Sequence, residues 1–227
     1  MTKSPLTKEE FLDRLEKREN YLYRVGVLAT RNNDYLKWAN EYINEHLTDD
    51  NNLDGIVQIT RKSSYKVKHS STSNGNTNRG EELFVLHLFK NKEKDSVKDI
   101  FGELIDYQVP LKNRQSDKGV GKIDFLFKKD NALFFAEIKA ETNNESILKA
   151  IIELQTYYQL ANKEKLLKDF KNEIKDNNLP IKKCVVIFDK SVQAKQLDNP
   201  IIKNLLKKFG IKVIVLKMKM SIEQLEL

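Results

Sequence analysis

The segment GKIDFLFKKDNALFFAEIKA, in the middle of the chain, constrains the fold more than any other part of the sequence. Two apolar runs, 122–128 and 132–139, are rich in Phe, Leu and Ile and have the length of β-strands. Between them, Asp130 and Asn131 are residue types that tolerate the positive φ of a two-residue turn. The segment therefore predicts a β-hairpin.

The register of this hairpin places Asp124 directly opposite Glu137, with Lys139 on the same face. Like charges at such a pair, with Cβ atoms ~5 Å apart, destabilise a sheet. A divalent cation would offset the repulsion, and Mg²⁺ prefers oxygen ligands and often takes only one or two protein carboxylates. We therefore expect a site for Mg²⁺, for which Mn²⁺ can substitute. The opposite face of the hairpin is predicted to be core, formed by Ile123, Phe125, Phe127, Phe134, Ala136 and Ile138.

The spacing from Asp124 to the E-I-K triplet at 137–139, on adjacent strands, resembles the motif of the PD-(D/E)xK nuclease superfamily. Ile123 stands where that family usually has a proline. The triplet by itself is not specific, because it recurs at 173–175 in a lysine-rich, predicted helical stretch. The hairpin context distinguishes the first copy from the second.

The resemblance implies a role for each residue of the motif. Asp124 and Glu137, with the carbonyl of Ile138, would bind the metal ion. Lys139 would orient or activate the attacking water and stabilise charge in the transition state.

A glutamate on the first helix of this family often helps to hold a second metal ion. Glu81 and Glu82 are the candidates. Glu81 has capping-box spacing from Asn78, and Glu82 lies in line with Leu86 and Phe89, which are predicted to face the sheet. Glu82 is therefore the expected ligand. Relatives carry a Q-x-x-x-Y motif on the helix after the hairpin. In this chain Gln155 and Tyr158 have a different spacing, so Gln155 is interpreted as a residue at the edge of the apolar stripe.

The order of the other predicted elements matches the family core of a helix, three meandering strands, a helix and a strand. We predict an α/β fold with a restriction-endonuclease-like core at 79–217, in which helices flank a central mixed sheet. A helical N-terminal extension with a polar loop occupies 1–78, and a C-terminal tail occupies 218–227. The core elements are helix 80–91, strand 106–111, the hairpin, helix 146–161, strand 183–189, a helix from Pro200 towards Gly210, and a final strand up to 217.

The N-terminal extension carries weaker signals. Amphipathic patterns predict helices at 8–23 and 33–47, and the polar stretch SSYKVKHSSTSNGNTNRG is interpreted as a mobile connector. Several aromatic residues could stack on bases, but their helical spacing favours packing between helices. They are Tyr21, Tyr23, Tyr35, Trp38 and Tyr42.

Composition limits the classes of function. The formal net charge of +7 and the pI near 9.2 favour a polyanionic partner. No apolar run has the ~20 residues of a membrane span, and the first residues lack the apolar core of a signal peptide, so a cytoplasmic protein is expected. The single cysteine, Cys184, and three scattered histidines predict no zinc site.

Four lysines recur at helical spacing beside an apolar stripe and could follow a phosphate backbone, although a solvated helix face explains them more simply. They are Lys165, Lys168, Lys171 and Lys175.

The predicted function is that of a metal-dependent endonuclease that hydrolyses phosphodiester bonds in double-stranded DNA, in restriction or host defence. A structure-selective DNA repair or recombination nuclease is the first alternative, since it would share the same core. A nucleic-acid-binding module of the same fold without cleavage is the second. The prediction is compatible with a homodimer, but no pattern in the sequence specifies one.

Overall fold

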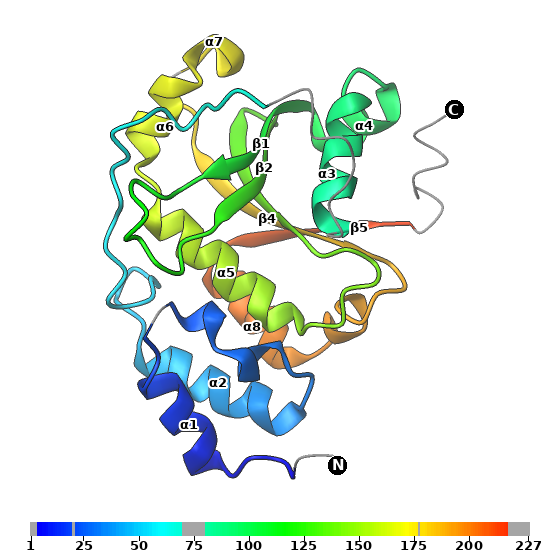
Figure 1. The fold of residues 1–227 in the computed structure, drawn as a ribbon. Helices are drawn as coiled ribbons and strands as arrows, with labels where there is room; N and C mark the ends of the chain where they lie inside the picture. The colour runs from blue at the N-terminus through cyan, green and yellow to red at the C-terminus, as the bar shows by residue number, and fades with distance from the viewer. Residues whose placement is uncertain (1–3, 20, 70–79, 177, 218–227) are drawn as a thin grey trace.

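The computed structural model of the chain describes residues 4–19, 21–69, 80–176 and 178–217. A five-stranded mixed sheet forms its centre, with the strands in the order β1-β2-β3-β4-β5 (Figure 1). The first three strands are antiparallel neighbours, and β3, β4 and β5 are parallel. The strands are β1 (Glu103–Pro110), β2 (Lys122–Lys129), β3 (Ala132–Ile138), β4 (Ile181–Phe188) and β5 (Ile211–Leu216).

Helices cover both faces of the sheet. On one face, α5 and α8 pack on a large apolar core that continues into the N-terminal helices, and on the other face α3 and α4 cover a second core rich in phenylalanine (Figure 1). The predicted α/β class, with a mixed sheet between helices, is thereby confirmed. The helices are α1 (Lys8–Glu16), α2 (Asn33–Glu45), α3 (Gly80–Lys90), α4 (Asp95–Phe101), α5 (Ile147–Leu160), α6 (Lys163–Asp169), α7 (Lys171–Ile174) and α8 (Pro200–Lys208), with short 3₁₀ turns η1 (Leu22–Arg24), η2 (Gly26–Ala29) and η3 (Ala194–Gln196).

The predicted hairpin is present as β2 and β3. Asp130 and Asn131 both have positive φ, 51° and 54°, as a tight two-residue turn requires. The antiparallel ladder runs from this turn to the pair Phe125–Ala136. One predicted core position differs, because Ile123 packs in the core on the α5 side, whereas Phe125 belongs to the core on the α3 side. The regular alternation of β2 side chains between the two faces of the sheet is therefore broken between Ile123 and Phe125, where the ladder with β3 ends.

The N-terminal extension shares the core on the α5 side and is not a separate layer. Phe11 of α1 packs against Tyr35 and Trp38 of α2, with ring centroids 5.0 and 5.6 Å apart, as expected for packing between helices. The first predicted helix is shorter than 8–23, since α1 ends at Glu16 and 3₁₀ turns follow.

The prediction of a mobile connector is wrong for the first part of that polar stretch. Tyr65 is fully buried, and its backbone N–H donates to Asp169 at 2.8 Å. His69 lies 2.6 Å from Asp106 of β1 and stacks on Tyr107. The rest of that stretch, 70–79, lies outside the described residues.

Two further elements differ from the prediction. Helix α4 begins at Asp95, the last residue of the polar K-E-K-D stretch, where no helix was predicted, and β1 starts three residues earlier than expected, at Glu103. Among the described residues, no helix is long and apolar enough to cross a bilayer.

The junction of α4 and β1 gives a test of the fold. Gly102 has a φ of +70°, and a Cβ there would overlap the carbonyl oxygen of Lys128 on β2. Gly210, after α8, has a φ of +60° but open space around the same position. We expect Gly210→Ala to cost about 1 kcal/mol of unfolding free energy, the penalty of the left-handed region alone. Gly102→Ala should cost at least about 1 kcal/mol more. Urea denaturation measures both, and equal losses would contradict the close packing of α4 on β2.

Candidate active site at the ends of strands β2 and β3

The motif residues lie together at the end of the hairpin that is remote from its turn. Glu137 is near the end of β3, and Lys139 follows that strand directly; both are only 4% exposed. The Lys139 Nζ lies 2.7 Å from Glu137 Oε1. Asp124, on β2, accepts a hydrogen bond of 2.9 Å from the backbone N–H of Ile138, and the Gln108 side chain donates to it at 3.4 Å. The structure thus brings Asp124, Glu137 and Lys139 into one cluster.

Helix α5 and the loop before it add further carboxylates. The Lys139 ammonium lies 3.3 Å from Glu153 and 4.0 Å from Glu145. Lys149, one turn after Glu145, forms an ion pair with it. With Glu81 included, five carboxyl groups surround two ammonium groups, so the cluster would be net negative if all five were ionised.

On helix α3 the carboxylate with a described contact to the site is Glu81. It accepts a 2.8 Å hydrogen bond from Asn143, in the loop between β3 and α5, and interacts electrostatically with Asp124 and Lys139. Glu82, the expected ligand, is the next residue along the helix and is partly buried.

The orientation of α3 explains the position of Glu81. Its buried residues are Phe84, Val85 and Leu88, which lie three, four and seven positions after Glu81. The predicted inward stripe, which included Leu86 and Phe89, is therefore rotated from the observed one. Asn78, the expected partner in a capping box, lies outside the described residues.

Sequence reasoning missed Glu153 and Tyr157. The Tyr157 hydroxyl donates to Glu153 Oε1 at 2.7 Å, one helical turn away on α5. Gly121, just before β2, lies so close that a Cβ on it would overlap the Tyr157 hydroxyl. The four-residue spacing of an acid and a tyrosine, on the helix after the hairpin, is the signal that could have found this pair.

The prediction that Gln155 lies at the edge of the apolar stripe is wrong. It is 1% exposed and accepts a 2.6 Å hydrogen bond from the buried Lys183 of β4. Burial lowers the pKa of Lys183 to about 8, with a smaller contribution from Lys163. Gln155 therefore stabilises a buried lysine away from the motif.

Burial and mutual repulsion raise the proton affinity of the two motif carboxylates. Burial raises the pKa of Asp124 to about 7, against the opposing effects of the Ile138 N–H and Lys139. The pKa of Glu137 is raised well above its usual value, first by burial and then by the charges of Asp124 and Glu153. These two carboxyl groups therefore hold protons at higher pH than ordinary carboxylates do, and a bound cation could take the place of those protons.

Lys139 and Glu153 are held in their charged forms. Burial disfavours the Lys139 ammonium, but Glu137 and then Glu153 hold the pKa of Lys139 well above its usual value. Burial would raise the pKa of Glu153, yet Lys139 and the Tyr157 hydroxyl lower it overall. Lys139 is thus a permanent cation at the centre of the site.

The four lysines of the predicted basic stripe lie at the other end of the sheet. Helix α7 contacts the hairpin near its turn, where Lys128 donates to the Ile174 carbonyl. Leu133, paired with Ile181 at that end, is six residues from Lys139, which corresponds to ~20 Å along a strand. One member of the stripe, Lys165, is engaged with Asp169 at 2.9 Å. The structure does not bring these lysines to the carboxylates.

Oxygen ligands dominate the site. Within the described ranges, no three side chains of His, Cys, Asp or Glu are gathered so as to hold a metal ion between them. Glu137, Glu153 and Glu145 are instead directed at the Lys139 ammonium. The available donors are hard carboxylate oxygens, which suit Mg²⁺ or Mn²⁺ and do not suit softer metals.

Comparison of the chain with protein-family models, with curated proteins and with solved structures finds no match. The site must therefore be interpreted from its own geometry.

The raised pKa of Asp124 predicts a dependence of stability on pH. The folded protein retains the proton up to about pH 7, whereas an unfolded aspartate loses it near pH 4, so the contribution of Asp124 to stability is largest below about pH 4 and is lost as the pH rises to about 7. Asp124→Asn removes this titration. We expect the variant to lose less melting temperature than the wild type between about pH 4 and 7 in EDTA. Asp198→Asn, at an exposed carboxylate, is the control. Parallel curves for Asp124→Asn and wild type would contradict the raised pKa.

Proposed function

We propose that this protein is a metal-dependent nuclease of the PD-(D/E)xK type that hydrolyses phosphodiester bonds in DNA. The observation that carries the proposal is the cluster of Asp124, Glu137 and Lys139 at the ends of adjacent strands, with more carboxylates than cations around it. Crowding this many carboxyl groups at a buried site, where their ionised forms repel one another, is costly for a protein that does not use them. The five-stranded mixed sheet between two layers of helices also supports the restriction-endonuclease-like assignment.

A hard divalent cation fits the donor set. Asp124 and Glu137 would hold it, with the Ile138 carbonyl as the third protein ligand implied by the family motif and Glu81 or Glu82 as additional carboxylates. When bound, the ion polarises the phosphoryl group and acidifies a water molecule. Two protein carboxylates are a sufficient set for Mg²⁺, which keeps several waters and takes oxygens from the substrate phosphate.

Lys139 acts as a fixed positive charge. Its neighbours hold the ammonium in the protonated form, so it orients the attacking water and stabilises charge on the phosphoryl oxygens but does not serve as a general base. Glu153 lies 3.3 Å from its Nζ and keeps the ammonium in place when Glu137 is engaged elsewhere. Tyr157 in turn fixes the orientation of Glu153.

Restriction or host defence on double-stranded DNA is the proposed setting, and a structure-selective repair or recombination nuclease is the alternative enzyme. A module that binds nucleic acid without cleaving it is disfavoured by the site itself. Such a module would have no use for two carboxylates whose charges repel each other, since replacement of either would relieve the repulsion.

Substitution of the motif tests the chemistry. Asp124→Asn keeps an acceptor for the Ile138 N–H but removes the ligand charge, and Lys139→Met keeps the apolar stem but removes the ammonium. We expect each to lower the cleavage rate of plasmid DNA in Mg²⁺ by about 10²-fold or more. Circular dichroism checks that each variant is folded.

Lys175→Met is the matched control, because Lys175 ends the second E-I-K triplet, on α7 and the following turn. It should retain turnover and lose at most one phosphate contact, seen as a salt slope lower by about one unit. Wild-type rates in Asp124→Asn and Lys139→Met would exclude this active site. Loss of cleavage in Lys175→Met alone would place the active site at the second E-I-K triplet.

Metal binding should be visible without any substrate. Mn²⁺ at about 100 times its Kd should raise the melting temperature by roughly 5 to 10 °C, because it binds the folded state and relieves the paired charges. Glu137→Gln should abolish the shift, whereas Glu164→Gln, at an exposed position on α6, should preserve it. An undiminished shift in Glu137→Gln, or full cleavage in EDTA, would refute the metal site.

A further inference from the structure

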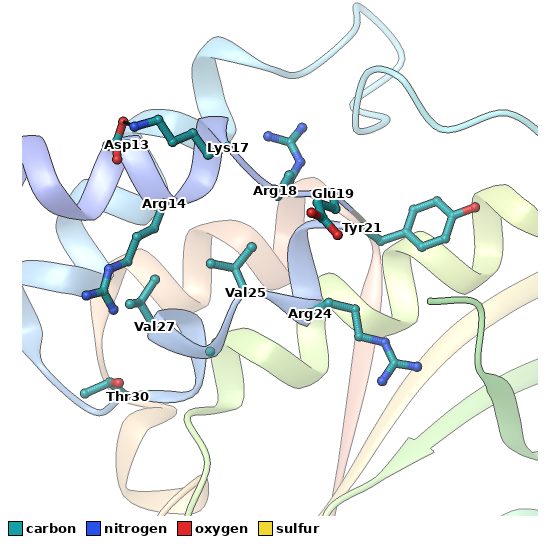
Figure 2. A pocket seen from close by; sticks show the side chains of 11 residues that line it. Asp13, Arg14, Lys17, Arg18, Glu19, Tyr21, Arg24, Val25, Val27 and Thr30 are labelled. Carbon is teal, nitrogen blue, oxygen red and sulfur yellow. Dashed lines mark ion pairs between the residues drawn. The ribbon is translucent and has the colours of Figure 1, made fainter. Parts of the chain in front are cut away.

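The N-terminal segment forms a basic cavity beside the candidate active site. A cavity of about 590 Å³ opens between α1 and the 3₁₀ turns η1 and η2. Figure 2 shows Arg14 and Arg24 extending on either side of Val25 at this cavity. Four cations and two anions line it; they are Arg14, Lys17, Arg18 and Arg24, with Asp13 and Glu19.

A second cavity adjoins the first. It measures about 320 Å³ and shares Arg18, Glu19 and Tyr21 with its neighbour. Lys118, in the loop that leads to β2, and Asp54 are among its other lining residues. Together the two neighbouring cavities are lined by five Lys and Arg side chains and three carboxylates. We call the two together the N-terminal groove.

Tyr21 occupies the place where the two cavities meet. Its ring is nearly parallel to that of Tyr23, with an interplanar angle of 6° and centroids 6.3 Å apart. Tyr21 is only half-buried, while Tyr23 is buried and held by a hydrogen bond to the Gly119 carbonyl. The groove therefore contains an aromatic ring on a rigid support, with both cations and carboxylates, Asp117 among them, in its surroundings.

Direct contacts connect the groove to the active site. Arg24 donates to the Gly119 carbonyl at 3.1 Å and lies over the Tyr23 ring. Tyr23 packs edge-on against Tyr157, with centroids 5.4 Å apart, and Tyr157 donates to Glu153. A chain of contacts thus runs from the groove, through two tyrosines, to a carboxylate that contacts Lys139.

We propose that the N-terminal groove binds an unpaired strand of the nucleic-acid substrate, with a base on Tyr21 and the flanking phosphates on Arg14, Lys17 and Arg24. The inference rests on the proposed nuclease function and specifies its substrate as DNA with a single-stranded stretch next to the cleaved bond. Cations that follow the backbone, together with an aromatic side chain for a base, are the combination that single-strand binding uses.

The shape of the groove favours an unpaired strand over a duplex. In a duplex the faces of the bases are hidden in the stack, so a tyrosine in a cavity can contact a base face only if the base is unpaired or extruded. The volumes of the two cavities lie in the ~300–1,000 Å³ range of sites for small ligands. Each is therefore large enough for a nucleotide.

The test measures binding apart from cleavage. A fluorescein-labelled oligothymidylate is titrated with the full chain in EDTA, and fluorescence anisotropy gives the Kd at several salt concentrations. We expect Tyr21→Ala to weaken binding at least about five-fold, the loss of one base–aromatic stack, and Tyr21→Phe to restore it. Arg14→Ala with Lys17→Ala should lower the salt slope by about 1.4 units.

The matched control is Lys203→Ala with Lys207→Ala on α8. These are also two exposed cations, and Lys203 is paired with Asp198 at 2.9 Å as Lys17, directly after α1, is paired with Asp13 at 2.7 Å. This double variant should bind as the wild type does.

The outcomes separate the groove from the nuclease function. Tighter binding of an unlabelled duplex than of the single strand would refute single-strand binding in the groove, even if the protein cleaves DNA. Equal losses of affinity in the α8 control and in the Arg14 and Lys17 variant would refute it as well. Binding that depends on Tyr21 in a protein that cleaves nothing in Mg²⁺ would support the groove and refute the proposed function.

Discussion

The ion pair between Lys139 and Glu137 is the interaction on which the site depends. Both side chains are almost completely buried at the end of the central strand, where an unpaired charge would be very costly. Neighbouring elements therefore supply partners for these charges. Glu153 on α5 and Glu145 in the loop before α5 contact the Lys139 ammonium, and a backbone N–H donates to the nearby Asp124. The positions of α5 and of the ends of the hairpin are coupled through this single ammonium group.

The N-terminal extension completes the surroundings of that cluster. Tyr23 packs against Tyr157, and its hydroxyl holds the Gly119 carbonyl in the loop before β2. Gly121 allows this loop to approach the Tyr157 hydroxyl, because any larger residue would overlap it. An extension with weak sequence signals thus packs against a residue that orients Glu153, and a change in η1 would be transmitted to the site through packed aromatic rings.

Local signals predicted the parts of the fold that depend on local geometry. The hairpin turn at Asp130 and Asn131 follows from residue types that tolerate positive φ, and it sets the register up to Phe125 and Ala136. Helices with a clear apolar stripe, such as α5, were found nearly to the residue. Helix α4 was not, because tertiary packing stabilises a short segment whose polar start carries no periodic pattern.

The sequence alone indicated that an aspartate and a glutamate on paired strands would lie close together, although the regular pairing from which this was argued ends at Phe125 and Ala136, one residue short of them. It could not determine which charges from distant segments join them. The rotation of α3 brings Glu81 to the cluster, and the packing of α5 on the sheet brings Glu153. The docking of η1 also places Arg24 beside Gly119. Only the tertiary structure decides these contacts, because each depends on how two elements pack across a core and not on the pattern within either one.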